Sequence, residues 1–262
     1  MVGHSKAIVG ARLRRSAARL GATLFFSICV LSAGEAKKGA LVYHLEATRP
    51  LSRFAPNQLL LVEKLNRVDR AHLGRLANVI VPNRWDLDLL AYSPMPLLVP
   101  WLSDERKALV IALPAQVFGA YEHGQLVRWG PVSSGGSTHE TPSGHYHLNW
   151  NARLRRSSVN AEWLMPWYFN FSDVIGLGVH QYDLPGRPAS HGCVRLLETD
   201  AKWLFHWGQG WTRDSYGDET LRPGTPVLII GAYDSSGGRP WLRPQWWSEG
   251  VTLDDSELVG LK

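Results

Sequence analysis

The stretch GVHQYDLPGRPASHGCVRL, residues 178–196, places Cys193 close to two histidines, His180 and His191. A thiol attacks a carbonyl as its thiolate, and a nearby imidazole can take the thiol proton and later return it to a leaving amine. His180 lies at the end of a predicted strand, and the 12-residue connection to Cys193 contains Pro185, Gly186 and Pro188. Such a connection can fold back, so we expect His180 and Cys193 to lie close together at the end of a strand.

Three other interpretations of this stretch stay open on the residues alone. Cys193 could be a small buried apolar residue, as free cysteines often are. Cys193, His180 and His191 could be three zinc ligands, or the histidines could be ordinary hydrogen-bonded polar residues. Gly192 favours catalysis, because a glycine beside a nucleophile permits backbone conformations in which N–H groups converge on an oxyanion.

The sequence around this stretch predicts a mainly β domain. Short apolar segments are separated by turn signals, with a turn expected at His123-Gly124. The predicted strands are 108–113, two within 117–136, 144–150, 165–171, 175–181 and 225–231. Residues 197–208 have helical spacing, with Thr199 or Asp200 as a candidate cap. This order predicts a β-sandwich or an irregular sheet with a small helix after Cys193.

The N-terminus has the pattern of a secretory signal peptide. Within residues 1–36, basic residues precede the apolar run GATLFFSICVLSA, and small residues follow it up to Ala36. The run is short for a membrane span. We therefore expect export, with an uncleaved signal anchor as the alternative.

Removal of this segment would change two properties of the protein. The segment carries five positive formal charges and one negative charge, so cleavage lowers the net charge from +5 to +1. The basic character is thus weak evidence for nucleic-acid binding, and we expect no nucleic-acid partner. Cys29 would also leave, and Cys193 would be a single cysteine in an oxidising compartment, which suggests a reactive thiol or intermolecular pairing.

The regions flanking the β domain are less informative. Residues 37–104 predict a small N-terminal α/β region: a linker to about 52, one or two helices and a strand over 53–83, and a connector over 84–104. The piece 59–83 resembles a degenerate LysM module, and a structural subdomain is the alternative. Residues 233–262 form a tail rich in Gly, Pro and Trp that could fold back or remain loose.

Two motifs resemble the L,D-transpeptidase catalytic domain, the YkuD-like family. The first is His180 followed by Ser190-His191-Gly192-Cys193 and Arg195. The second is GPVSSGGSTHETPSGHYHL, which is similar to the family's Ser-Thr-Gly and Thr-Pro-x-Gly segment. The resemblance covers residues 105–232 and implies a YkuD-like β-sandwich fold. It departs from the family at Gln181 and Tyr182, where many members carry Gly or Ser, and this departure leaves donor and acceptor preference open.

The resemblance implies acyl transfer on peptidoglycan stem peptides. Cys193 would attack the carbonyl of the third stem residue, D-alanine would leave, and an amine would resolve the thioester. His180 would be the general base and acid, oriented by the carbonyl of Gln181. His191 and Gly192 would shape the oxyanion site.

We expect substrate contacts from Ser190, Arg195, Tyr182 and Trp167. A structural role is the alternative for Ser190 and Arg195, with a buried ion pair as the form it would take at Arg195. Trp167 belongs to the aromatic segment 161–171, for which core packing is the alternative. We interpret residues 152–158 as a basic loop that is solvated or meets a substrate carboxylate. The surroundings of His139, His145 and His147 predict turn and strand rather than a metal site. The resemblance implies cysteine acyl transfer without a metal or cofactor.

The expected protein is an exported enzyme of the periplasm or cell envelope, with a signal peptide (1–36), an N-terminal region (37–104), a catalytic domain (105–232) and a tail (233–262). Its acceptor could be another stem peptide, a lysine of an outer-membrane lipoprotein, or water, which would make it an L,D-carboxypeptidase. A peptidoglycan-binding protein without catalysis is the alternative of a different class. The sequence leaves the oligomeric state open.

Overall fold

The computed structural model describes residues 40–217 and 219–253. The predicted signal peptide, residues 1–36, lies outside these residues. Among the helices that are described, none is both long enough and apolar enough to cross a membrane.

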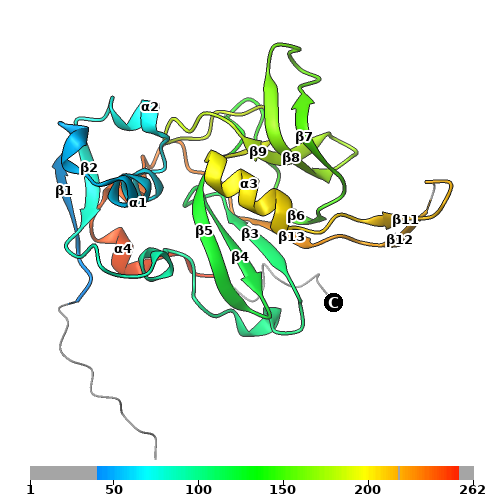
Figure 1. Cartoon of the computed structure of the whole chain (residues 1–262), viewed down its shortest axis with the longest axis horizontal. Helices are drawn as coiled ribbons and strands as arrows, with labels where there is room; N and C mark the ends of the chain where they lie inside the picture. The colour runs from blue at the N-terminus through cyan, green and yellow to red at the C-terminus, as the bar shows by residue number, and fades with distance from the viewer. Residues whose placement is uncertain (1–39, 218, 254–262) are drawn as a thin grey trace, which may run out of the picture. The chain divides into compact units, whose positions relative to one another are not determined.

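One curled sheet dominates the described part of the chain and confirms the mainly β prediction (Figure 1). Its nine strands there follow the order β6-β13-β3-β4-β5-β10-β9-β8-β7. Their bounds are β3 Ala108–Ala112, β4 Val117–Glu122, β5 Gln125–Ser133, β6 Gly144–His147, β7 Asn151–Arg156, β8 Leu164–Ser172, β9 Leu177–Gln181, β10 Val194–Leu196 and β13 Pro226–Ile230. Most neighbours are antiparallel, but β10 runs parallel to β9 and β13 runs parallel to β3.

Both faces of the sheet are covered at β3, which explains why this strand is apolar throughout. Side chains alternate between the faces of a strand. Leu109 and Ile111 pack in one hydrophobic cluster with Phe169 and Leu204, whereas Val110 packs in a second cluster on the other face. The two clusters give the curled sheet the two-layered packing of a sandwich.

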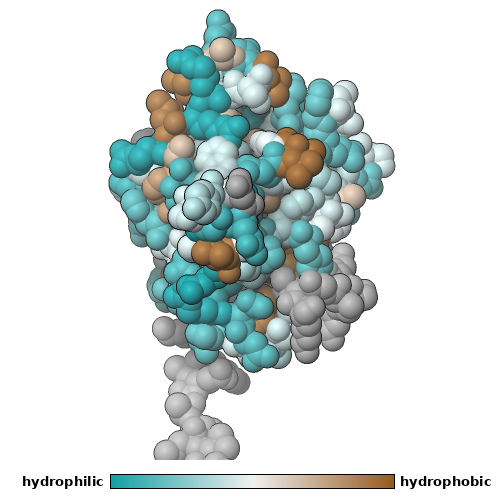
Figure 2. Space-filling view, turned by 90° about the vertical axis from the view of Figure 1, so that its right-hand side faces the viewer, coloured by the Kyte–Doolittle hydropathy of each residue, from teal (hydrophilic) through white to brown (hydrophobic). Residues whose placement is uncertain are grey.

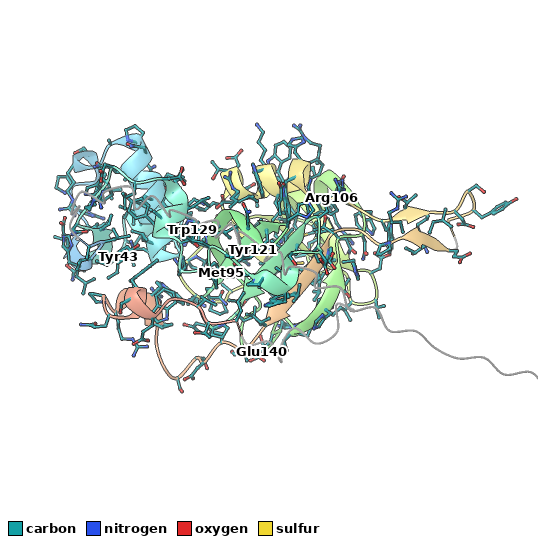
Figure 3. All side chains as sticks on the ribbon, turned by 90° about the horizontal axis from the view of Figure 1, so that it is seen from below. Tyr43, Met95, Arg106, Tyr121, Trp129 and Glu140 are labelled. Atoms are coloured by element: carbon teal, nitrogen blue, oxygen red, sulfur yellow. The ribbon has the colours of Figure 1, made fainter. Side chains whose placement is uncertain are left out.

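The second cluster joins the sheet to the N-terminal region and to the tail. Tyr43, Met95, Tyr121 and Trp129 are buried in it (Figure 3). Helix α1, Pro56–Asn66, begins with Pro56 in its first turn, where the missing N–H costs nothing. The described part of the tail, residues 233–253, folds back, since Trp241 is fully buried and Trp247 is 8% exposed.

Helix α3, Glu198–Trp207, follows Cys193 and β10 as the sequence predicts, and it packs against β8 and β9 (Figure 1). The predicted caps are wrong. Leu197 occupies the N-cap position, and no side chain caps it. The Asp200 carboxylate is buried instead and pairs with Lys64 Nζ of α1 at 2.7 Å and with Arg128 at 2.8 Å.

The predicted turn at His123-Gly124 is confirmed. The φ angles are 48° at His123 and 76° at Gly124. Two consecutive positive φ angles fit the tight hairpin turn whose twist matches the flanking strands β4 and β5.

Two segments expected to be irregular are strands. Residues 43–47 lie in the predicted linker but form β1, which pairs antiparallel with β2, Asn78–Pro82. The predicted basic loop is largely β7, at the edge of the main sheet. Charged residues are typical of edge strands because they discourage pairing with other chains. The basic pattern of 152–158 was therefore interpreted as a loop, although most of the segment is an edge strand.

The remaining elements are short. They are α2 Arg70–Leu73, α4 Trp246–Glu249, β11 Thr212–Arg213, β12 Thr220–Arg222 and the 3-10 helices Leu51–Arg53, Leu89–Tyr92, Pro100–Leu102 and Pro240–Leu242. The hairpin β11–β12 extends away from the sheet (Figure 1). The face seen in Figure 2 is mostly hydrophilic, with apolar residues in separate small patches.

Candidate active site

The parallel pairing of β9 and β10 brings Cys193 and His180 to the same face of the sheet. Arg195 is the register partner of His180, and Val194 is the partner of Val179. Since side chains alternate along a strand, Cys193 shares the face of Arg195 and therefore that of His180. Cys193 and His180 line one cavity of about 80 Å³. The fold thus produces the juxtaposition that the short connection predicts.

His180 is a buried neutral base with a fixed orientation. Its side chain is 4% exposed, and its Nδ1 lies 2.9 Å from the backbone carbonyl of Gln181. A carbonyl only accepts, so Nδ1 carries the proton and Nε2 keeps its lone pair. Burial lowers the pKa of His180 to about 4, and the Arg195 charge acts in the same direction. At neutral pH the ring can therefore accept a proton at Nε2.

The Cys193 thiol is also uncharged in the free protein. Burial raises its pKa above the usual value, although the Gly178 N–H and the nearby guanidinium charges of Arg155 and Arg195 act in the opposite direction. Cys193 is the single cysteine among the residues described, and it is a free thiol. A neutral thiol beside a neutral imidazole must transfer its proton during attack rather than before it.

The loop before Cys193 is braced by its own hydroxyl group. Ser190 Oγ donates to the carbonyl of Cys193 and accepts the Gly192 N–H at 3.1 Å. Gly192 has φ of 100°, in the region that favours glycine, and a Cβ there would lie 2.9 Å from Leu177 Cδ2. The Gly192 N–H, which we expected at the oxyanion site, is directed to Ser190 in this structure.

The second motif supports the same loop. Thr141 Oγ1 accepts the Gly135 N–H at 2.8 Å and donates to the Gly192 carbonyl at 2.7 Å. The Gly136 N–H donates to the Ser190 carbonyl at 2.9 Å. The sequence identifies this segment only by resemblance; its role as a clamp on the nucleophile loop depends on contacts between residues far apart in the chain.

The predicted substrate contacts divide into two groups. Tyr182, Ser190, His191 and Arg195 line the Cys193 cavity. The Arg195 guanidinium stacks over the Tyr182 ring at 4.7 Å. The His191 ring is exposed and lies between the rings of His139 and Trp163, at 4.6 and 4.8 Å.

Trp167 does not line the cavity. It has φ of 55°, an unusual value for a strand residue, and its ring packs against Phe205 and His206 of α3. Trp163, the residue immediately before β8, lines the cavity instead, as does Met165. The core-packing alternative therefore describes Trp167, whereas Trp163 is the aromatic residue of segment 161–171 that substrate could reach.

Arg155 is a cavity residue that the sequence leaves undistinguished from its neighbours in β7. Its guanidinium lies 4.6 Å from the rings of both Trp150 and Tyr168. Its Nη1 is buried and has no hydrogen-bond partner among the described residues. Arg155 and Arg195 thus place two guanidinium groups around Cys193.

Within the described part of the chain, no three His, Cys, Asp or Glu side chains form a metal-binding group.

Comparison with known proteins identifies the domain. The family model for the L,D-transpeptidase catalytic domain matches residues 106–229. This segment, just under half of the chain, is the part that matches the family. The L,D-transpeptidase match includes both motifs, the Cys193–His180 pair and the Thr141 clamp. None of the curated proteins compared with the chain matches it.

Several solved L,D-transpeptidases are similar to parts of the chain. The enzyme from Stackebrandtia nassauensis is 23% identical, with a TM-score of 0.41, over 50% of this chain and 58% of that one. An L,D-transpeptidase from Mycobacterium smegmatis is 17% identical, with a TM-score of 0.39, over 48% and 59%. L,D-transpeptidase 3 from Mycobacterium tuberculosis is 19% identical, with a TM-score of 0.38, over 48% and 61%. The chain spans less than two thirds of the length of each.

Proposed function

We propose that the protein is an exported cysteine acyltransferase that acts on peptidoglycan stem peptides. The observation that carries this proposal is the shared face of Cys193 and His180, with His180 Nδ1 held by the Gln181 carbonyl and Nε2 left to accept a proton. A nucleophile, a base and a group that orients the base form the arrangement needed for nucleophilic catalysis.

In the first half-reaction, Cys193 Sγ attacks the carbonyl of the third stem residue while His180 Nε2 takes the thiol proton. The tetrahedral intermediate collapses, the C–N bond to D-alanine breaks, and the imidazolium gives its proton to the leaving amine. A thioester on Cys193 and free D-alanine result. Arg155 and Arg195 suit a donor that carries carboxylates, because guanidinium groups bind carboxylates in a bidentate manner.

In the second half-reaction, an acceptor amine attacks the thioester. A C–N bond forms, the C–S bond breaks, and the amine proton passes through His180 back to the thiol. Water as acceptor would instead give an L,D-carboxypeptidase. An amine of another stem gives a cross-link, and a lipoprotein lysine gives protein attachment.

Export to the periplasm or cell envelope forms part of the proposal. Its support is the basic, apolar and small-residue pattern of residues 1–36. Cell fractionation, with sequencing of the mature N-terminus, tests it. Full-length protein in the cytoplasm would contradict export and leave the chemistry at Cys193 untouched.

The decisive experiment is intact-protein mass spectrometry after incubation with a tetrapeptide muropeptide. The native protein should gain the mass of the tripeptide-containing acyl group and release D-alanine, and Cys193→Ala should do neither. Dimer or tripeptide in the supernatant then separates transferase from carboxypeptidase. Binding of the muropeptide without an adduct, D-alanine or product would favour the non-catalytic binding protein. Stoichiometric zinc that is lost in His180→Ala would favour a zinc site.

A further inference from the structure

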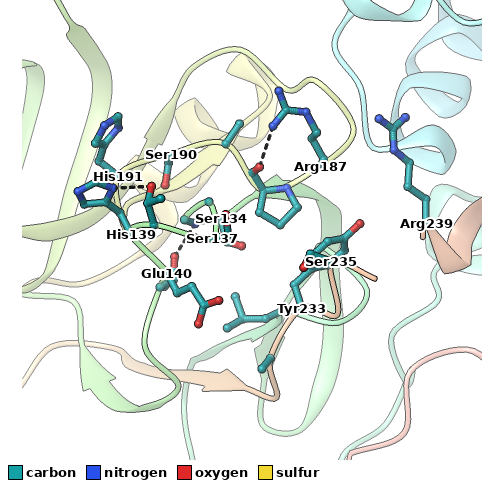
Figure 4. A pocket seen from close by; sticks show the side chains of 18 of the residues that line it. Ser134, Ser137, His139, Glu140, Arg187, Ser190, His191, Tyr233, Ser235 and Arg239 are labelled. Carbon is teal, nitrogen blue, oxygen red and sulfur yellow. Dashed lines mark hydrogen bonds between the residues drawn. The ribbon is translucent and has the colours of Figure 1, made fainter. Parts of the chain in front are cut away.

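The connection between His180 and Cys193 is held in place by two different parts of the chain. The half that leads into Cys193 is bound by the catalytic domain, where the Ser134 carbonyl accepts the N–H groups of Ala189 and Ser190 at 2.9 and 3.0 Å. Figure 4 shows Ser134 and Ser190 next to each other. The half that follows His180 is bound by the N-terminal region instead.

One residue of the N-terminal region, Asp69, binds both backbone groups of Leu184. Its Oδ2 accepts the Leu184 N–H at 2.7 Å, and its own N–H donates to the Leu184 carbonyl at 3.1 Å. The neighbouring residues Val68 and Pro185 form an antiparallel bridge. Because Leu184 is fully buried, its backbone groups need partners within the protein, and Asp69 supplies both.

Gly186 allows the N-terminal region to approach this closely. Its φ is 73°, in the region that favours glycine, and a Cβ there would lie 2.9 Å from Val68 Cγ1. The backbone conformation and the close contact with Val68 both require a glycine, so the connection is fitted to the N-terminal region.

Asp69 is itself fixed relative to the main sheet. Its Oδ1 accepts the His72 N–H at 2.9 Å and so caps α2. Two residues earlier, Arg67 ends α1 with φ of 58°, and its buried guanidinium donates to the carbonyl of Ala115, between β3 and β4, at 3.0 Å. Burial acts to raise the pKa of Asp69, but the N–H groups of His72 and Leu184 outweigh it and lower the pKa, so the acceptor is an ionised carboxylate at neutral pH.

The position of Leu184 decides where two walls of the Cys193 cavity lie. Tyr182 and Asp183 directly precede Leu184. The Arg195 guanidinium stacks over the Tyr182 ring at 4.7 Å, and its Nη1 lies 3.5 Å from the Asp183 carbonyl. Both Tyr182 and Arg195 line the cavity. The juxtaposition of Cys193 with its histidine, in contrast, depends on the pairing of β9 and β10.

We propose that Asp69 is a positioning residue for the donor substrate: by holding Leu184, it fixes Tyr182 and Arg195 in the wall of the Cys193 cavity. This inference rests on the proposed acyl transfer at Cys193. Asp69 lies outside residues 106–229, which match the family domain, so the N-terminal region supplies part of the support for the donor site.

Asp69→Ser tests the proposal, because serine caps a helix about as well as aspartate but is too short to reach Leu184 as well. Formation of the acyl-enzyme is measured over a range of tetrapeptide concentrations. The KM for the donor should rise roughly tenfold, the effect of losing one charge-assisted hydrogen bond, and the maximal rate should stay within about twofold of the native value. Alkylation of Cys193 by iodoacetamide should not change.

Two further variants separate positioning from folding. Asp69→Asn keeps the length and one acceptor oxygen, so its KM should fall between the native and Ser values; it decides the question if Asp69→Ser does not fold. Asp88→Ser is the matched control, because Asp88 is an exposed cap whose Oδ1 accepts the Leu90 N–H at 2.8 Å, away from the connection. It should keep the native KM. Partial unfolding would lower the amount of acyl-enzyme rather than raise the KM.

An unchanged KM in folded Asp69→Ser or Asp69→Asn would overturn the inference, as would an equal rise in Asp88→Ser. Amide hydrogen exchange provides a readout that does not need catalysis. In Asp69→Ser, exchange in residues 182–186 should be about tenfold faster or more, while β9 and β10 stay protected. Native protection of 182–186 in this variant would also contradict the proposal. Failure of the native protein to form any acyl-enzyme would instead contradict the proposed function.

Discussion

Thr141 donates its hydroxyl hydrogen to the carbonyl of Gly192 at 2.7 Å, across 51 positions of the chain. The same oxygen accepts the Gly135 N–H, so one buried hydroxyl joins the two motifs of the catalytic domain. The position of Cys193 therefore depends on a residue that does not line its cavity.

Thr141→Val should lower both stability and the rate of acyl-enzyme formation. The substitution keeps the shape but leaves a buried N–H and a buried carbonyl without their partner, at a cost of about 1–3 kcal/mol in the free energy of unfolding. Urea unfolding and the kinetics of adduct formation measure the two effects. Thr199→Val, at an exposed position of α3, is the control and should change neither by much. Native kinetics in Thr141→Val would show that the clamp is unnecessary for positioning Cys193.

The pH dependence should distinguish a neutral Cys193–His180 pair from a preformed ion pair. Because burial raises the pKa of Cys193, the thiolate fraction and the rate of alkylation by iodoacetamide should still be rising above pH 9. Because the pKa of His180 is lowered to about 4, its base form is lost only as the pH falls through that value, so acyl-enzyme formation should be level between about pH 5 and 8.

A plateau of alkylation at neutral pH would indicate a thiolate–imidazolium pair and contradict this prediction. His180→Gln is the companion variant. It should lose acyl-enzyme formation while its alkylation by iodoacetamide still increases with pH, since alkylation requires the thiolate but not the base.

Loss of Trp163 should weaken substrate binding, whereas loss of Trp167 should lower stability. Trp163 lines the Cys193 cavity, so Trp163→Ala should raise the KM for the stem-peptide donor roughly three- to tenfold, the value of one aromatic contact. Trp167 packs on α3, so Trp167→Ala should lower the free energy of unfolding by about 2 kcal/mol. Steady-state kinetics and thermal unfolding of both variants measure the difference. The reverse pattern would show that substrate contacts Trp167.

The buried pair Lys64–Asp200 should respond unequally to loss of either partner. Asp200→Ala leaves the Lys64 ammonium, 3% exposed, without a carboxylate, and should cost about 3–5 kcal/mol in urea unfolding. Lys64→Met should cost less, because Arg128 still pairs with Asp200 at 2.8 Å. Glu46→Gln, in the more exposed pair with Arg53, should cost at most about 1 kcal/mol. Equal losses in Asp200→Ala and Glu46→Gln would show that burial of the pair has no effect on its contribution.

Local patterns were sufficient where one segment determines its own structure. The apolar run of β3, the His123-Gly124 turn and the spacing of α3 follow from alternation, from residues that tolerate positive φ, and from helical periodicity. The chain reversal between His180 and Cys193 also follows from nearby residues, because Pro185, Gly186 and Pro188 favour it. The mainly β class and the family of the catalytic domain were therefore predictable.

Local patterns failed where the partner lies far away in the chain. Asp200 has the residue type of a helix cap, but Lys64, 136 positions earlier, draws its carboxylate into the interior. Strands β1 and β7 carry polar residues because each exposes one side to solvent, and only pairing with β2 and β8 makes them strands.

The sequence by itself determined the nucleophile candidate and its histidine, because these follow from residue type and short spacing, and its resemblance to a known family favoured acyl transfer among the interpretations that the residues left open. Tertiary structure alone decided that Trp163 rather than Trp167 faces Cys193, that Thr141 clamps the nucleophile loop, and that Asp69 holds Leu184. Each of these depends on which surfaces the curled sheet buries against one another, and burial is a property of the whole fold rather than of any segment.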